Sequence, residues 1–252
     1  MILDRFRIDG RIAVVTGGTK GLGKAIALAF AEAGADIVAV SRKPNPGLEK
    51  SVLALRRRYI HYSADLANRD QARGVIPAVL EKTGGIDILV NNAGIIRRSP
   101  AAEYSEVDWD ATLEIDLTAP FILSQAAGRI MLKKGKGKII NIASVLAFQG
   151  GINVTAYTSA KHGVVGLTKA FANDWASKGV NVNALAPSFF VTELTEPIKK
   201  DPERSKSITA RTPAARWGLP EDIAGAAVFL ASPASDFIHG VVLPVDGGWL
   251  AW

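Results

Sequence analysis

The sequence predicts a single α/β domain in which a parallel sheet is covered by helices on both faces. Short apolar runs alternate with amphipathic segments along the chain, which is the pattern of strands buried between two helical layers. A length of 252 residues suits one such domain with a substantial core, and no linker rich in proline, glycine or serine divides it. The 24 glycines and the 48% of hydrophobic residues indicate an ordered chain with many tight turns.

Seven apolar runs are the expected strands. They lie at residues 11–16, 36–41, 59–63, 87–91, 138–143, 180–185 and 241–245, and the third is the weakest. Helical periodicity is expected between them at residues 21–33, 49–57, 68–82, 106–132, 156–177 and 221–231. Gly34 ends the first of these helices, and Pro77 is an unfavourable residue within the third.

The stretch at about 187–217 is the least regular part of the chain. It lies within a segment that holds four prolines, Pro187, Pro197, Pro202 and Pro213. Long irregular stretches in a compact domain are often functional loops, so we expect a lid over the substrate here.

Composition excludes several classes of chemistry. With no cysteine, the chain has no disulfide, thiolate zinc site, iron–sulfur cluster or cysteine nucleophile. His61, His162 and His239 are too scattered to predict a metal site. A net charge of +6 is too small to predict nucleic acid as the partner. No run reaches the ~18 apolar residues of a membrane span and no signal peptide is evident, so a cytoplasmic location is expected, without a membrane partner.

A glycine-rich turn joins the first expected strand to the first expected helix. It reads T-G-G-T-K-G-L-G at residues 16–23. Glycines let the backbone approach a pyrophosphate closely, and the helix N-terminus offers it free N–H groups. The lysine and hydroxyl residue of an ATP-binding loop do not follow. The turn therefore predicts a Rossmann-type, doubly wound domain that binds a dinucleotide.

The residues after the second strand bear on which dinucleotide binds. An acidic residue about 20 positions beyond the glycines would hold the ribose hydroxyls of NAD. Ser41 and Arg42 stand there instead, and a guanidinium suits a 2′-phosphate. Lys20, within the glycine turn, adds a second positive charge. We therefore expect NADP(H) to be preferred over NAD(H), the alternative being that Lys20, Arg42 and Lys43 are ordinary solvated charges.

Ser144, Tyr157 and Lys161 form the candidate catalytic group. Ser144 ends the fifth expected strand, and Tyr157 and Lys161 share one face at the start of a helix. A free tyrosine has a pKa near ~10, which an adjacent ammonium lowers. Ser144 can donate a hydrogen bond to a carbonyl oxygen. This group supports proton transfer at an alcohol or ketone oxygen, coupled to hydride transfer at the neighbouring carbon.

Together these motifs resemble the short-chain dehydrogenases/reductases over nearly the whole chain. The resemblance rests also on D-L at residues 65–66, N-N-A-G at 91–94 and the segment from Ala186 to Thr192. It implies an NAD(P)-dependent enzyme and a homotetramer, with the apolar tail at residues 249–252 at a subunit contact or on the domain's own core. Residues expected at the cofactor, from the glycine turn or from the resemblance, are Gly17, Thr19, Lys20, Gly21, Leu22, Gly23, Ser41, Arg42, Asp65, Leu66, Asn92, Ala93, Gly94, Tyr157, Lys161, Pro187, Phe190 and Thr192.

Two positions depart from the pattern of that family. Asp116 stands where members carry a helical asparagine, and an ionised aspartate can only accept hydrogen bonds. Asp116 is a further candidate for the catalytic group, orienting the water that connects Lys161 to solvent, or else a structural polar residue. Ser188 follows Pro187 in place of glycine, so that loop is expected to be set differently.

The substrate is indicated by a weaker resemblance to the sugar-acid branch of the family. It rests on G-I-I-R-R at residues 94–98 and V-D-G-G-W-L-A at 245–251. Arg97 or Arg98, beside Ser144 and Tyr157, is then expected to meet the carboxylate of a deoxy-keto-gluconate, with Arg204 and Arg211 as further candidates. The alternatives are surface arginines, a reductase of 3-oxoacyl thioesters or other carbonyls, and a catalytically silent NADP-binding regulatory module.

Overall fold

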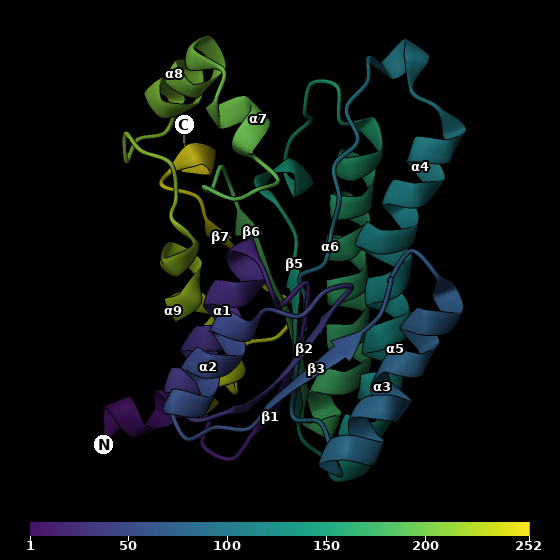
Figure 1. Ribbon diagram of the computed structural model, residues 1–252, viewed down its shortest axis with the longest axis vertical. Helices are drawn as coiled ribbons and strands as arrows, with labels where there is room; N and C mark the ends of the chain where they lie inside the picture. Colours follow the sequence, from purple (N-terminus) through teal and green to yellow (C-terminus); the bar gives the residue numbers. More distant parts are fainter. Residues whose placement is uncertain (252) are drawn as a thin grey trace.

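The computed structural model describes residues 1–251, so Trp252 of the apolar tail lies outside the described part of the chain. Within it, seven parallel strands form one sheet in the order β3-β2-β1-β4-β5-β6-β7 (Figure 1). The strands are β1 (Ile12–Thr16), β2 (Asp36–Ser41), β3 (Tyr59–Ser63), β4 (Ile88–Asn91), β5 (Gly137–Ile142), β6 (Val180–Pro187) and β7 (Val242–Val245). The seven predicted strands are confirmed. The order reverses between β1 and β4, which opens a crevice beyond the carboxyl ends of those strands.

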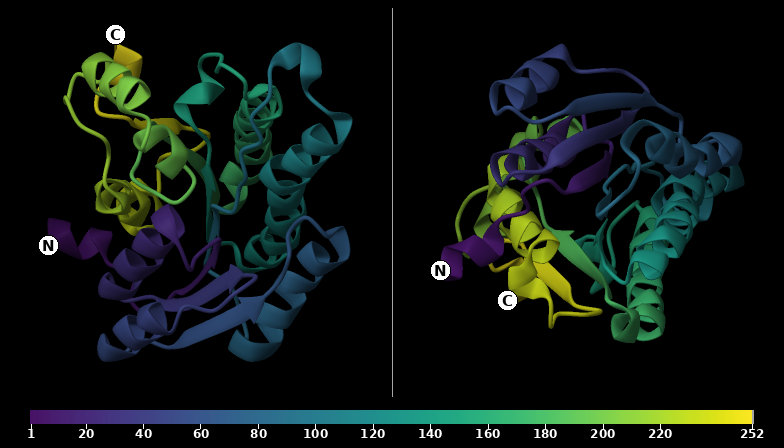
Figure 2. Two further views of the ribbon diagram at one scale, coloured as in Figure 1. Left: turned by 45° about the horizontal axis from the view of Figure 1, so that its top comes forward. Right: turned by 90° about the horizontal axis from the view of Figure 1, so that it is seen from below.

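Helices cover both faces of the sheet, as Figures 1 and 2 show. On one face lie α1 (Gly21–Glu32), α2 (Pro46–Ala54) and α9 (Ala224–Ala231), and on the other α3 (Arg69–Thr83), α5 (Ala119–Lys134) and α6 (Thr155–Trp175). Phe30 and Leu48 are fully buried in the first layer, and Val75 and Leu123 in the second. The predicted doubly wound α/β fold is therefore confirmed. Among residues 1–251, no helix combines the length and apolarity needed to cross a membrane.

The second helix begins earlier than predicted. It starts at Pro46, and the side chain of Asn45 accepts a hydrogen bond from the Leu48 N–H at 3.0 Å. Asparagine caps a helix N-terminus, and proline fits its first turn because no N–H is needed there. The Asn-Pro pair was the available signal for this start.

The helix predicted at 106–132 is interrupted. Its parts are α4 (Glu106–Leu113), a π-helical turn (Glu114–Thr118) and α5. Pro120 has no N–H to bond the Asp116 carbonyl, and the Ala119 N–H bonds instead to the Glu114 carbonyl, five residues back. The turn leaves the Asp116 side chain fully buried.

The segment predicted as irregular contains two helices, so that expectation is wrong for α7 (Glu196–Lys199) and α8 (Pro202–Arg211). Asp201 caps α8 by accepting hydrogen bonds from the Glu203 and Arg204 N–H groups, both at 3.1 Å. The prolines that suggested irregularity occupy first helical turns, where they are tolerated. Both helices stand beyond the carboxyl ends of β6 and β7, at the top of Figure 1.

Candidate active site

Ser144, Tyr157 and Lys161 come together at the carboxyl end of β5. Ser144 follows that strand, and its Oγ accepts a hydrogen bond from the Leu146 N–H at 3.1 Å. α6 begins at Thr155, which places Tyr157 and Lys161 one turn apart, with Nζ of the lysine 5.2 Å from the tyrosine ring centroid. The Ser144 hydroxyl acts to lower the pKa of the nearby Tyr157 phenol. Lys161 is buried while Tyr157 is only partly so, which leaves the tyrosine accessible to a substrate.

The electrostatic setting of Tyr157 differs from the expectation. Burial raises the pKa of Tyr157 above its ordinary value, and although the Lys161 ammonium acts to lower it, the Asp116 carboxylate adds to the rise. Lys161 acts to lower the pKa of Tyr157, as expected, but the net shift of that pKa in the protein is upward. Desolvation of the phenolate outweighs one nearby cation whose charge is shared with a carboxylate.

That carboxylate belongs to Asp116, which lies directly against Lys161. Its Oδ2 is 3.2 Å from Lys161 Nζ, and its Oδ1 accepts a hydrogen bond from the Ile95 N–H at 2.8 Å. Lys161 Nζ also donates to the Ile142 carbonyl at 3.0 Å. Burial alone lowers the pKa of Lys161, but Asp116 and Tyr157 outweigh it and hold that pKa above its usual value. The lysine is therefore charged and paired inside the protein.

The glycine turn after β1 is joined to the segment after β4. Thr16 Oγ1 accepts hydrogen bonds from the Asn92 and Ala93 N–H groups at 2.9 and 3.0 Å. Gly17 has a φ of +61°, and a Cβ there would lie 2.8 Å from the Asn92 amide nitrogen. Only glycine accommodates both the left-handed backbone and this close approach. The two predicted cofactor segments thus meet at the crevice between β1 and β4.

The N-terminus of α1 fits a dinucleotide pyrophosphate. Lys20 occupies the capping position without a side-chain cap, and the first turn contains no acidic residue. The N–H groups of Gly21, Leu22 and Gly23 in this first turn thus have no side-chain cap as acceptor, which leaves them available to an anion. Lys20 itself is already engaged, because its Nζ donates to Glu193 Oε2 at 2.7 Å on the protein surface.

Ser41 and Arg42 have different environments at the end of β2. Ser41 Oγ accepts a hydrogen bond from Thr19 Oγ1 at 3.0 Å, donates to the Lys43 carbonyl at 2.8 Å and lies 3.0 Å from His61 Nε2. These hydrogen bonds of the Ser41 hydroxyl thus stabilise the turn. Arg42 is exposed, and no carboxylate in residues 1–251 pairs with it. His61 was not predicted here, because its position depends on how β3 pairs with β2.

The remaining predicted cofactor residues lie in two places. Asp65 accepts a hydrogen bond from the Ala67 N–H at 3.1 Å, and Leu66 is buried beside it. Thr192 faces the glycine turn, since a Cβ on Gly21 would lie 3.3 Å from its methyl group. Phe190 is buried in the core.

The loop after β6 keeps an ordinary backbone. Pro187 is the last residue of β6, and Ser188 Oγ donates to the Asp246 carbonyl at 3.0 Å. Ser188 is not among the residues with positive φ, so its replacement of glycine imposes no left-handed strain.

The structure separates the candidate substrate arginines. Arg97 Nε lies 3.5 Å from Asp108 Oδ1 on α4, whereas Arg98 pairs with no carboxylate in the described residues. Partial burial and the neighbouring Arg204 guanidinium lower the pKa of Arg98, and the facing Tyr157 acts in the opposite direction. Arg211 instead lies 3.9 Å over the Trp249 ring. Arg98 is therefore the candidate substrate arginine whose charge acts on Tyr157, and Arg204 is a second guanidinium close enough to act on Arg98.

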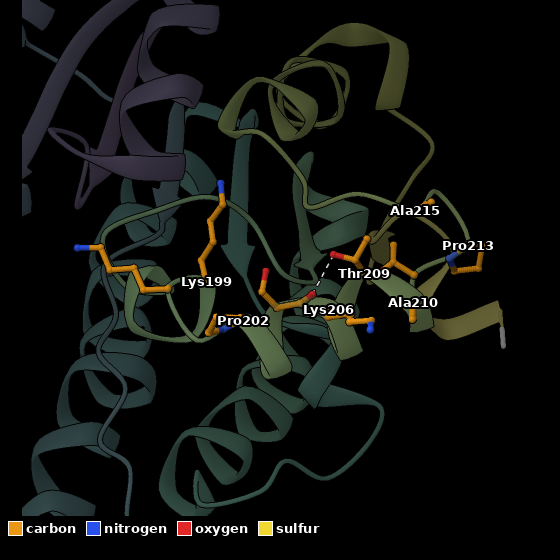
Figure 3. A pocket seen from close by; sticks show the side chains of 10 residues that line it. Lys199, Pro202, Lys206, Thr209, Ala210, Pro213 and Ala215 are labelled. Carbon is orange, nitrogen blue, oxygen red and sulfur yellow. Dashed lines mark hydrogen bonds between the residues drawn. The ribbon is translucent and has the colours of Figure 1, made fainter.

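A cavity of about 790 Å³ lies against α8, outside the catalytic group. Figure 3 shows its lining, with Lys199 towards one end and Pro213 and Ala215 towards the other. Neither Ser144, Tyr157 nor Lys161 contributes to it. The cavity lies between α8 and the chain that follows, so this region is less closely packed than the sheet core.

Comparisons with known proteins agree with this arrangement. A protein-family model described as enoyl-(acyl carrier protein) reductase matches residues 17–250. The chain is 48% identical over 253 residues to the 2-dehydro-3-deoxy-D-gluconate 5-dehydrogenase of Escherichia coli K12, covering 100% of both chains. Two solved structures superpose with TM-scores of 0.95.

The first of these structures is a provisionally named NAD(P)-dependent gluconate 5-dehydrogenase from Beutenbergia cavernae, with NADP at low occupancy. It is 47% identical, and the match covers 98% of this chain and 100% of that one. The second is a gluconate 5-dehydrogenase from Burkholderia cenocepacia in complex with NADP and tartrate. It is 41% identical, and the match covers 100% of both chains.

Proposed function

Because the chain belongs to the short-chain dehydrogenase/reductase family, we propose that it is an NADP(H)-preferring oxidoreductase of a sugar-derived keto or hydroxy acid, such as a deoxy-keto-gluconate. The chain is an oxidoreductase that interconverts a ketone and a secondary alcohol. The observation that carries the proposal is the buried Lys161 beside Tyr157 and Ser144, at the mouth of the crevice that holds the glycine turn.

Each catalytic side chain has a distinct role in this proposal. Tyr157 gives its proton to the ketone oxygen during reduction and takes it back from the alcohol during oxidation. Ser144 donates a hydrogen bond to the same oxygen, and Lys161 stabilises the phenolate. When bound, the nicotinamide ring supplies or accepts the hydride at the carbon that carries this oxygen.

Arg98 and Arg204 support an acidic substrate. Arg98 pairs with no carboxylate in the described residues, and its pKa responds to both Arg204 and Tyr157. A substrate carboxylate would relieve the repulsion between the two guanidiniums and accept their hydrogen bonds. The Escherichia coli relative is named for a keto sugar acid, and the Burkholderia cenocepacia relative was crystallised with tartrate, a hydroxy acid. A 3-oxoacyl thioester, the alternative substrate considered from the sequence, offers no carboxylate next to its ketone.

The preference for NADP(H) rests on Arg42. Its guanidinium is exposed at the end of β2, where the adenosine ribose is expected, and no carboxylate in residues 1–251 competes for it. Two structural relatives were crystallised with NADP. We therefore assign the 2′-phosphate contact to Arg42 and leave Lys20, already paired with Glu193, a lesser role.

We also propose a cytoplasmic homotetramer. Phe121 of α5 is 41% exposed and stacks on Phe171 of α6 with ring centroids 6.2 Å apart, and Phe171 stacks on Trp175 at 4.2 Å. An exposed edge of a continuous aromatic stack is better covered by a second copy of the chain than by water.

The function is tested by comparing substrates and one variant. A deoxy-keto-gluconate should be reduced with NADPH far faster than an acetoacetyl thioester at equal concentration. Tyr157→Phe should lower turnover by about 10²-fold or more, the scale of a lost general acid, while NADPH still binds. Preferred reduction of the thioester would overturn the substrate class, and full activity of the variant would overturn the mechanism.

A further inference from the structure

Asp116 places a carboxylate where it affects the charge of the catalytic group without reaching into the crevice. Its side chain is completely buried in the π-helical turn between α4 and α5. Oδ1 accepts a hydrogen bond from the Ile95 N–H at 2.8 Å, whereas Oδ2 forms an ion pair with Lys161 Nζ at 3.2 Å but no hydrogen bond. Burial raises the pKa of Asp116, and the Lys161 ammonium and the Ile95 N–H act to lower it. A protonated carboxyl would need an acceptor for its own hydrogen, and these contacts provide none, so they suit the ionised form that pairs with Lys161.

The packing around Asp116 keeps this contact short. Gly94 lies directly against the carboxylate, where a Cβ would come within 2.9 Å of Oδ2. On the other side, the Ile142 carbonyl accepts a hydrogen bond from Lys161 at 3.0 Å and fixes the ammonium. Water has little room between the two charges, which are 5% and 0% exposed, so their interaction is weakly screened.

The charges that act on Tyr157 come from three elements. Lys161 lies one turn away on α6, Asp116 comes from the π-helical turn, and Arg98 comes from the loop after β4. The Ser144 hydroxyl is neutral, and Arg204 of α8 acts on Arg98. The Asp116 carboxylate offsets the Lys161 charge, which leaves Arg98 as the cation that acts on the phenol without a carboxylate partner among the described residues.

We propose that Asp116 is a positioning residue that serves as the buried counter-ion of Lys161 and keeps Tyr157 protonated to higher pH than a neutral residue would. The role rests on the function proposed above, because it acts on the proton that Tyr157 exchanges with substrate. Alcohol oxidation needs the phenolate, so the carboxylate moves the onset of oxidation towards alkaline pH. An uncharged residue of the same shape would move it back.

Asp116→Asn separates charge from shape, because the amide oxygen can still accept from the Ile95 N–H. The inflection in the pH profile of kcat/KM for alcohol oxidation should fall by about one unit or more. Glu114→Gln is the matched control, since Glu114 lies in the same turn but pairs with Arg69 on α3. The inflection in the pH profile of Glu114→Gln should not move. An unmoved inflection in Asp116→Asn, with or without loss of the plateau, overturns the counter-ion role.

Two further measurements cover a variant that fails to fold. Asp116→Ser removes the same charge and carries the same expectation. In the unaltered protein without cofactor, the tyrosine ¹³Cζ resonance assigned through Tyr157→Phe should titrate above the ordinary value of ~10, and titration below it overturns the proposal. If Tyr157→Phe were fully active, the proposed function would fail instead. If Tyr157→Phe is inactive but the inflection of Asp116→Asn does not move, the proposed function stands and only the role of Asp116 is overturned.

Discussion

Individual side chains around the crevice differ in whether their charge already has a partner. Lys161 is paired with Asp116 in the interior, and Lys20 with Glu193 on the surface. Arg42 and Arg98 have no carboxylate partner among residues 1–251. A cation without a protein partner gains most from an anionic ligand, since no existing ion pair has to be broken. These two arginines therefore give the clearest residue-level predictions.

Arg42→Ala should weaken NADPH binding by about 10- to 100-fold, the scale of one charge-assisted hydrogen bond or bidentate pair. NADH has no 2′-phosphate, so its dissociation constant should change by less than about 3-fold. Titration of cofactor fluorescence measures both constants. Lys43→Ala, which removes the adjacent exposed cation, is the control and should affect NADPH less. Equal losses for NADPH and NADH would mean that Arg42 supports the fold of the turn and not the phosphate.

Arg98→Met should raise KM for the sugar acid by about 10-fold or more and leave KM for a neutral ketone nearly unchanged. The physical reason is the loss of a guanidinium that has no other anion to bind. Arg97→Met is a matched control one residue away, because Arg97 is engaged with Asp108 on α4. Steady-state kinetics with both variants decide the assignment. A larger effect at Arg97 than at Arg98 would reverse it.

At the scale of elements, the strands were predictable and the segments that depend on local exceptions were not. Buried strands such as β1 are nearly continuous apolar runs, so their position and the residues at their ends follow from the sequence. The π-helical turn depends on the missing N–H of Pro120, and α8 depends on the cap by Asp201. Pro120 and Asp201 are both visible in the sequence, but the periodicity of apolar residues does not predict the turn or the helix start that depends on them.

The candidate site divides in the same way. Tyr157, Lys161 and the glycine turn were predictable because their spacing within one element or one turn is itself the motif. The choice of Arg98 over Arg97 was not, because it depends on a contact with α4. Nor was the ion pair of Asp116 with Lys161, which requires a turn and a helix far apart in the sequence to meet.

Asp87 links three elements and makes stability depend on pH. It precedes β4, accepts a hydrogen bond from the Ile12 N–H of β1 at 3.0 Å, and pairs with Lys134 of α5 and with Arg11. Burial acts to raise the pKa of Asp87, but the Lys134 hydrogen bond and the Ile12 N–H outweigh it and hold that pKa below its usual value. A carboxyl with a depressed pKa in the folded state stabilises the protein above the unfolded-state pKa. This stabilisation is lost as pH falls through the folded-state value.

Asp87→Asn should therefore lower the free energy of unfolding at pH 7 by about 1–3 kcal/mol. The difference from the unaltered protein should shrink as pH falls below the ~3.9 of an unperturbed aspartate. Urea unfolding at several pH values measures it. Asp70→Asn removes an 88% exposed carboxylate of α3 and should cost less than about 0.5 kcal/mol. A gap for Asp87→Asn that is constant with pH would contradict the electrostatic origin.

Across the whole molecule, the catalytic crevice and the proposed subunit contact occupy separate surfaces. The crevice lies at the carboxyl ends of the strands, whereas the aromatic stack belongs to α5 and α6. These two helices cover one face of the sheet (Figure 1). Gly128 allows the stack to sit close to α5, since a Cβ there would lie 2.6 Å from the Trp175 ring. The exposed ring of Phe121 can thus be covered by a second copy without closing the active site.

A tetramer of identical chains with dihedral symmetry contains at least two kinds of two-fold contact, so disrupting one should leave dimers. Phe121→Glu puts a charge at the exposed end of the aromatic stack, where its burial against another chain would be costly. Light scattering should give four times 26.7 kDa for the unaltered protein and twice that mass for the variant. Leu53→Glu, at a 53% exposed position of α2 on the opposite face of the sheet, should keep the larger mass.

A tetramer that survives Phe121→Glu would place the contact elsewhere, and a monomeric unaltered protein would overturn the assembly. Because the aromatic stack lies apart from Tyr157, dimers of Phe121→Glu should also retain turnover. Retained turnover would show that assembly is lost because the surface has changed and not because the chain misfolds.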